Sequence, residues 1–135
     1  MDSQGLKGIQ TKLVRGLLDT VVLQLLNTNP MHGYQIITSL RKNFGVYFGP
    51  STVYPLLSVL EEKGYITSHW NLESERPRKI YRITSQGVNM LDSAEASLGQ
   101  ICRKLISGLE RAPVNSEIGN FTSPTGLKKH IGIAY

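Results

Sequence analysis

Cysteine, histidine and tryptophan are scarce in this sequence: its 135 residues include one cysteine, three histidines and one tryptophan. The single cysteine, Cys102, excludes an internal disulfide and is typical of a protein from a reducing compartment. His32, His69 and His130 share no metal-ligand spacing with one another or with Cys102. We therefore expect no metal site and no cofactor.

Long apolar runs are also lacking. The longest, Leu17–Leu26, contains Asp19 and Gln24 and falls well short of the ~20 residues that a membrane-spanning helix needs. The first residues lack the basic segment, apolar run and cleavage site of a signal peptide. These absences predict a cytoplasmic protein that does not contact a membrane.

Sequence motifs of catalysis are missing as well. The chain has no glycine-rich phosphate loop, no nucleophile elbow and no carboxylate pair in a mechanistic arrangement, so we do not expect an enzyme. Its 15 Lys and Arg against 10 Asp and Glu give a net charge of +5, which favours a polyanionic partner. The length fits one domain with an appendage.

Apolar residues recur at helical spacing in the first half of the chain. Leu13, Leu17, Val21 and Leu25 predict one helix from about residue 10 to 26. Similar stripes predict a second helix over 33–44 and a third over 50–63, which Pro50 opens and Gly64 follows. Residues 65–72 and 79–83 are rich in aromatic and β-branched side chains, with a polar turn between them, and predict a β-hairpin.

A long helix is predicted over residues 84–111, with Thr84 as its N-cap. A rod of roughly 27 residues spans about 40 Å, too long for a core of this size to cover. Its apolar residues follow a heptad pattern, which indicates a partner helix. We predict a homodimer that pairs through Leu91, Ala94, Leu98, Ile101, Leu105 and Leu109, with Cys102 packed in the same seam. Residues 112–135 are interpreted as a flexible tail.

Three helices followed by a hairpin are the order of a winged helix. The predicted fold class is therefore mainly α (α+β): a winged helix-turn-helix with a two-stranded wing and a long C-terminal dimerisation helix. The third helix would enter the major groove of double-stranded DNA. Its exposed face consists of Ser51, Pro55, Ser58 and Glu62, flanked by Thr52 and Tyr54. The alternative is ordinary capping by Ser51 and Thr52, with a half-buried Tyr54.

The densest positive charge lies in the hairpin, where Arg76, Arg78, Lys79 and Arg82 fall within seven residues. Such side chains neutralise phosphates or enter a narrow minor groove. The alternative is that the charged hairpin is only a solvated loop. The exposed face of the third helix is nearly free of acidic residues before Glu61, and this favours DNA binding over that alternative.

The region from Gly16 to Gly87 resembles the DNA-binding domain of the PadR family of transcriptional regulators. Each matching segment is short, but they occur in the family's order, and the series closes at Gly87. The segments are Arg15–Asp19, Met31–Ile36, Gly49–Leu57, Leu60–Ile66 and Arg76–Thr84.

The resemblance implies a homodimeric winged-helix regulator, usually a repressor, that binds an inverted repeat near promoters. It implies a DNA-binding domain over 1–83 and a dimerisation helix over 84–111, while the tail 112–135 lies outside the resemblance and its role is left open. It matches Tyr54 to the recognition-helix tyrosine, Ser51 and Thr52 to a hydroxyl-bearing cap, and Arg78 and Lys79 to the basic wing.

Two further candidates follow with alternatives. Tyr34 matches a family tyrosine that could approach the phosphate backbone, or it packs in the core; Lys12 is a candidate phosphate contact.

Some short members of the family bind flat aromatic ligands between tryptophans of the dimer helices, but the one tryptophan here, Trp70, lies in the hairpin. A small-molecule effector is left open and unidentified. The alternative function is a winged-helix module for protein interaction without sequence-specific DNA readout.

Overall fold

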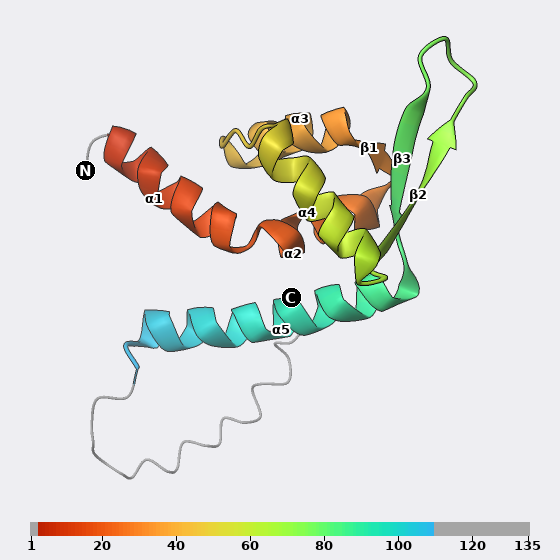
Figure 1. Cartoon of the computed structure of the whole chain (residues 1–135). Coiled ribbons are helices and arrows are strands. Elements are labelled where there is room, and N and C mark those ends of the chain that lie inside the picture. Colours follow the sequence, from red (N-terminus) through yellow and green to blue (C-terminus); the bar gives the residue numbers. More distant parts are fainter. Residues whose placement is uncertain (1–2, 110–135) are drawn as a thin grey trace. The chain divides into compact units, whose positions relative to one another are not determined.

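The computed structural model describes residues 3–109 (Figure 1). Helices and a small sheet alternate along the chain, and the predicted winged-helix fold class is confirmed. The elements are α1 (Ser3–Gly16), α2 (Leu18–Thr28), β1 (Met31–His32), α3 (Gly33–Phe44), α4 (Pro50–Glu62), β2 (Ile66–Asn71), β3 (Arg78–Ile83) and α5 (Ser85–Ser107).

The first predicted helix is in fact two helices, so the prediction of one helix over 10–26 was wrong. Leu17 interrupts it with φ −112° and ψ 15°, outside the helical region. Its backbone N–H donates to the carbonyl of Val14 at 3.0 Å, three residues back, which tightens the end of α1. Because α2 then starts again at Leu18, the apolar period continues across the break and does not reveal it.

The sheet has three antiparallel strands in the order β1-β3-β2, one more than the predicted two-stranded wing. In the hairpin, Ile66 pairs with Ile83 and Asn71 with Arg78. The additional strand β1 pairs Met31 with Tyr81 and His32 with Ile80. Two residues are too few to show the alternation typical of a strand, which is why the sequence pattern missed it. β1 attaches the wing to the start of α3.

The hydrophobic core draws on α2, α3, α4, β2 and the first turns of α5. Its most deeply buried side chains are Val22, Leu23, Ile36, Leu40, Val53, Leu57, Ile66 and Leu91. Leu91 was predicted to pair with a second copy of the chain. It is only 1% exposed within this core, so its side chain already has its apolar neighbours and that prediction is corrected.

Thr84 caps α5 as predicted: its hydroxyl accepts the Gly87 N–H at 3.1 Å and donates to the Gly64 carbonyl at 2.7 Å. The other end differs from the prediction, because the helix stops at Ser107 and not at Arg111. Leu109, with φ 51°, has left the helix, so its predicted place on a helical dimer stripe was wrong.

A Schellman arrangement ends α5. The Gly108 N–H donates to the Leu105 carbonyl at 3.3 Å, and the Leu109 N–H donates to the Lys104 carbonyl at 2.9 Å. Gly108 has φ 91°, which a residue with a Cβ rarely adopts. This glycine therefore fixes the point where the helix ends.

The chain divides into two compact units between Ser93 and Ala94, within α5. In residues 94–109, Ala94 and Leu98 are half-buried, while Ile101, Cys102 and Leu105 are exposed. Within residues 3–109, no helix combines the length and hydropathy needed to span a bilayer. The predicted tail over 112–135 lies outside the described residues.

Candidate nucleic-acid interface

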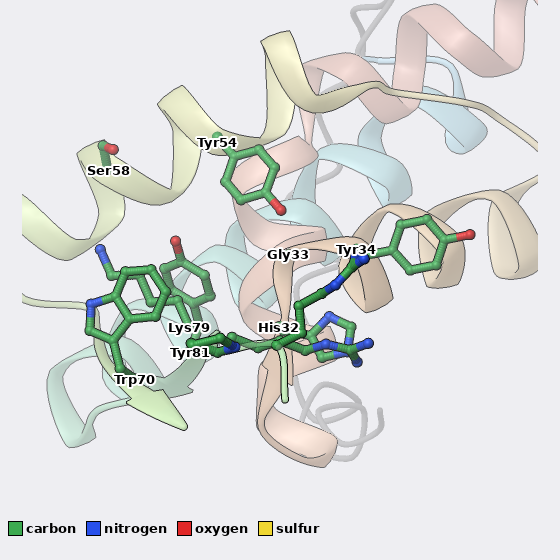
Figure 2. Close-up of a pocket in the computed structure, with 11 residues that line it drawn as sticks. His32, Gly33, Tyr34, Tyr54, Ser58, Trp70, Lys79 and Tyr81 are labelled. Carbon is green, nitrogen blue, oxygen red and sulfur yellow. The ribbon is translucent and has the colours of Figure 1, made fainter. Parts of the chain in front are cut away.

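An open groove of about 790 Å³ lies between the start of α3, the outer face of α4 and the β2–β3 hairpin (Figure 2). It brings together side chains that are far apart in the sequence. Residues predicted from the sequence to bind DNA supply more than half of its lining: Tyr34, Tyr54, Ser58, Arg76, Arg78 and Lys79. The groove therefore joins the predicted recognition helix to the predicted wing.

The first turn of α4 is built around Pro50, which occupies the start of the helix after the N-cap residue Gly49. The Thr52 and Val53 N–H groups both donate to the Gly49 carbonyl at 3.0 Å. Because Gly49 is the N-cap and α4 starts at Pro50, Ser51 and Thr52 lie inside the helix, and the capping alternative for them was wrong. Their first turn contains no acidic residue, which leaves the positive end of the helix dipole uncompensated by a side chain.

The outer face of α4 presents Ser51, Tyr54, Pro55 and Ser58 as exposed residues, with Thr52 partly exposed beside them. Tyr54 is 41% exposed, so its ring is partly packed and partly open to the groove. Figure 2 shows the ring projecting from α4 toward the backbone of Gly33. Hydroxyl groups on such a face can bond phosphates or base edges.

Two cations of the wing contact other residues of the groove lining. The Arg78 Nη1 lies 3.0 Å from His32 Nε2. The Lys79 Nζ lies 5.9 Å from the centre of the Trp70 ring, its partner across the hairpin, within cation–π range. Arg76 is exposed in the connecting loop, where the Ser74 hydroxyl donates to its carbonyl at 2.7 Å.

Burial, together with the charge of Arg78, lowers the pKa of His32 below its usual 6.5. This shift favours the neutral imidazole, which fits its position beside Arg78, because a guanidinium can only donate. Tyr81 lies deeper in the groove, and burial first, then the negative charge of Glu61 and the nearby Tyr54, raises the pKa of its phenol.

The structure decides between the alternatives for Tyr34. Its side chain is 70% exposed at the start of α3 and lines the groove, so the core interpretation was wrong. Lys12 is exposed on α1 and is not part of the groove lining. Ser51, Thr52 and Pro55 share the outer face of α4 but do not line the groove either.

Sequence reasoning missed five groove residues: His32, Gly33, Trp70, Pro77 and Tyr81. The hairpin register would have revealed Trp70, because it pairs directly with Lys79. His32 and Gly33 are at the groove because β1 pairs with β3, and a two-residue strand leaves no sequence signal. In the part of the chain that the structure describes, no three His, Cys, Asp or Glu side chains gather as metal ligands.

Comparison with known proteins gives this interface its context. The family model of the "Transcriptional regulator PadR-like family" matches residues 22–93, more than half of the chain. The protein belongs to this PadR-like family. It is a DNA-binding transcriptional regulator, and its family is one of regulators and not of enzymes.

Solved and curated proteins agree with this assignment. The PadR-like chain is similar to a PadR family regulator from Eggerthella lenta, with 32% identity, a TM-score of 0.71, and coverage of 81% of this chain and 96% of the other. A transcriptional regulator from Clostridium thermocellum matches with 28% identity and a TM-score of 0.61, over 71% of this chain and 95% of that one. Transcriptional regulator Rv3488 of Mycobacterium tuberculosis is 30% identical over 59% of this chain and 74% of its own length.

Proposed function

We propose that this PadR-like protein is a cytoplasmic homodimeric repressor that binds an inverted-repeat operator. In this proposal α4 enters the major groove, and the β2–β3 hairpin contacts the adjacent backbone or minor groove. The observation that carries it is the groove itself, which Tyr54 and Ser58 of α4 line together with the cations of the wing.

Charge and chemistry support DNA as the occupant of this surface. Arg76, Arg78 and Lys79 line the groove, and among the described residues no Asp or Glu shares that lining. A phosphate backbone would meet uncompensated positive charge there, and each phosphate contact releases counterions. Tyr54 and Ser58, with Ser51, Thr52 and Pro55 beside them, would face the bases, and Tyr34 and Lys12 would contact phosphates.

Dimerisation through α5 is supported by its exposed apolar stripe. Ala94, Leu98, Ile101 and Leu105 recur at heptad spacing, and Ile101 and Leu105 are 54% and 66% exposed. We assign residues 84–111 to dimerisation and 1–83 to DNA binding. Leu6, Ile9 and Leu13 of α1 are also exposed, at 57%, 45% and 61%. Paired protomers would set two recognition helices about one DNA turn, ~34 Å, apart.

The wing tests this function. The double variant Arg78→Ala/Lys79→Ala should bind operator DNA and unrelated DNA about tenfold more weakly, because two phosphate contacts are lost. The slope of log affinity against log salt should become shallower by about two. Gel-shift titrations over a salt series, with DNA from upstream of the protein's own coding region, measure both quantities.

The matched control is Lys42→Ala/Lys63→Ala, which removes two exposed lysines that do not line the groove. It removes the same net charge as the wing variant but at positions outside the groove, so it should keep most of the affinity and the salt slope. Salt-insensitive or absent binding of the wild-type protein would instead support the alternative, a winged-helix module that binds another protein.

A further inference from the structure

The two residues His32 and Gly33, here called the His32–Gly33 junction, join β1 to α3 and line the groove between α4 and the wing. Their backbone is fixed on both sides. His32 pairs with Ile80 of β3 in the sheet, and its N–H donates to the Gln35 side-chain oxygen at 3.0 Å within α3. In Figure 2 the junction lies between Tyr54 and the wing. A rigid piece of backbone therefore separates the two arms of the proposed DNA interface.

Gly33 provides the surface on which Tyr54 rests. A Cβ atom at position 33 would collide with the hydroxyl and ring carbons of Tyr54, so the ring lies directly against the glycine backbone. Gly33 is buried although it has no side chain. It does not have a positive φ, so its backbone can also be adopted by alanine. The absence of a side chain at this position serves Tyr54 and is not a demand of the backbone.

His32 holds the other arm. Its Nε2 lies 3.0 Å from Arg78 Nη1, across 46 positions of the sequence. A guanidinium has donors only, so this contact is a hydrogen bond in the tautomer of His32 whose Nε2 is unprotonated. An arginine on an exposed strand would otherwise sample many rotamers, and fixing it before DNA arrives lowers the entropy cost of binding.

We infer that the His32–Gly33 junction is a positioning element that fixes Tyr54 of α4 and Arg78 of the wing relative to each other. Neither junction residue needs to touch DNA for this role. The inference rests on the proposed function, because it explains how two side chains from separate elements are presented to one duplex. It predicts that each junction residue acts only through its own partner.

A double-mutant cycle tests the Gly33 arm. Gly33→Ala should weaken operator binding about tenfold, because Tyr54 must swing away. In a Tyr54→Ala background the same substitution should change affinity less than about twofold, since nothing remains to be displaced. Thermal denaturation of Gly33→Ala should show a cooperative transition, so that weaker binding is not a result of unfolding. Gly8→Ala on α1 is the matched control, with open space at its Cβ position, and should bind like the wild type.

A second cycle tests the His32 arm and does not depend on the folding of Gly33→Ala. At pH 7.5, His32→Ala should lower operator affinity about threefold and make the salt slope shallower by up to about one, because Arg78 is no longer held. In an Arg78→Ala background it should have no further effect. His32→Gln should restore affinity and slope, because its amide oxygen can accept from the guanidinium.

The outcomes separate this inference from the proposed function. If Tyr54→Ala and Arg78→Ala bind the operator like the wild type, the proposed interface is wrong and the positioning role fails with it. If those variants bind weakly but Gly33→Ala and His32→Ala cost as much in their backgrounds as in the wild type, the interface stands and the positioning role is overturned. Loss of the junction effects in both backgrounds supports it.

Discussion

Two stretches of this PadR-like chain share an amphipathic helical pattern but differ in what covers the apolar face. In α3 and α4, Ile36, Leu40 and Leu57 are fully buried in the core. In residues 94–109, Ile101, Leu105 and Ile106 are more than half exposed. The apolar period alone does not distinguish the two stretches.

The difference shows what a hydrophobic stripe specifies. A stripe predicts that a face will be covered, because leaving apolar surface in water is unfavourable by roughly 25 cal/mol per Å². It does not predict whether the cover comes from the same chain. Leu91 and Leu98 illustrate this: they are seven residues apart on one helix, yet Leu91 belongs to the core and Leu98 is only half-buried.

The strongest way to test this comparison is to place a charge on the uncovered stripe. Leu98→Asp should convert the proposed dimer to a monomer, because an unpaired carboxylate would be buried between two helices at a cost of several kcal/mol. Operator binding should then be lost, since one protomer reaches only one half-site. Sedimentation velocity and gel shift measure the two effects.

Ala96→Asp is the control for this substitution. Ala96 is exposed and lies off the heptad stripe, so the same new charge should leave both assembly and DNA binding intact. A Leu98→Asp protein that remains dimeric would show that the subunits meet at another surface.

Truncating one apolar side chain in each stretch should change the free energy of unfolding by very different amounts. Leu57→Ala in the core should lower the free energy of unfolding by 2–5 kcal/mol, because it removes apolar contacts and leaves a cavity. Ile106→Ala should change it by less than about 0.5 kcal/mol, because this side chain is 86% exposed and lies off the heptad stripe. Urea denaturation of both variants at one protein concentration provides the measurement. A cost above about 1 kcal/mol for Ile106→Ala would mean that its face also has a partner.

The fold was largely predictable because the apolar period of the helices, and the glycine or proline residues at their ends, are visible in the sequence. The second predicted helix matches α3, and Gly45, with φ 68°, ends it where the sequence indicated. The break at Leu17 and the strand β1 were not predictable in this way. The strand β1 depends on its pairing with β3, and the apolar period continues across the break at Leu17, so the hydrophobic pattern marks neither of them.

The exposed polar and aromatic side chains of the candidate site were predictable from the sequence. The backbone surface at Gly33, against which Tyr54 packs, was not. Tyr54, Ser58 and Arg78 are polar or aromatic residues on faces that the apolar period leaves outside, so their exposure follows from the pattern. Gly33 gives no such signal, because its role depends on the approach of Tyr54 from another helix. The core alternative for Tyr34 failed because residue type does not tell which face of a helix start is covered.

The smallest expected effect is the pH dependence of stability that arises from His32, which lies beside Arg78. Because its pKa in the folded protein is lowered below 6.5, the unfolded chain takes up a proton before the folded chain does. This contribution to stability is therefore complete above pH 6.5 and is lost as the pH falls from there through the folded pKa.

We expect the wild-type free energy of unfolding to fall between pH 7.5 and pH 5, and His32→Gln to show a smaller fall over that range. His69→Gln, which changes an exposed histidine of β2, should keep the wild-type fall. Denaturant titrations at the two pH values measure the difference, and an identical pH profile for His32→Gln and wild type would contradict it.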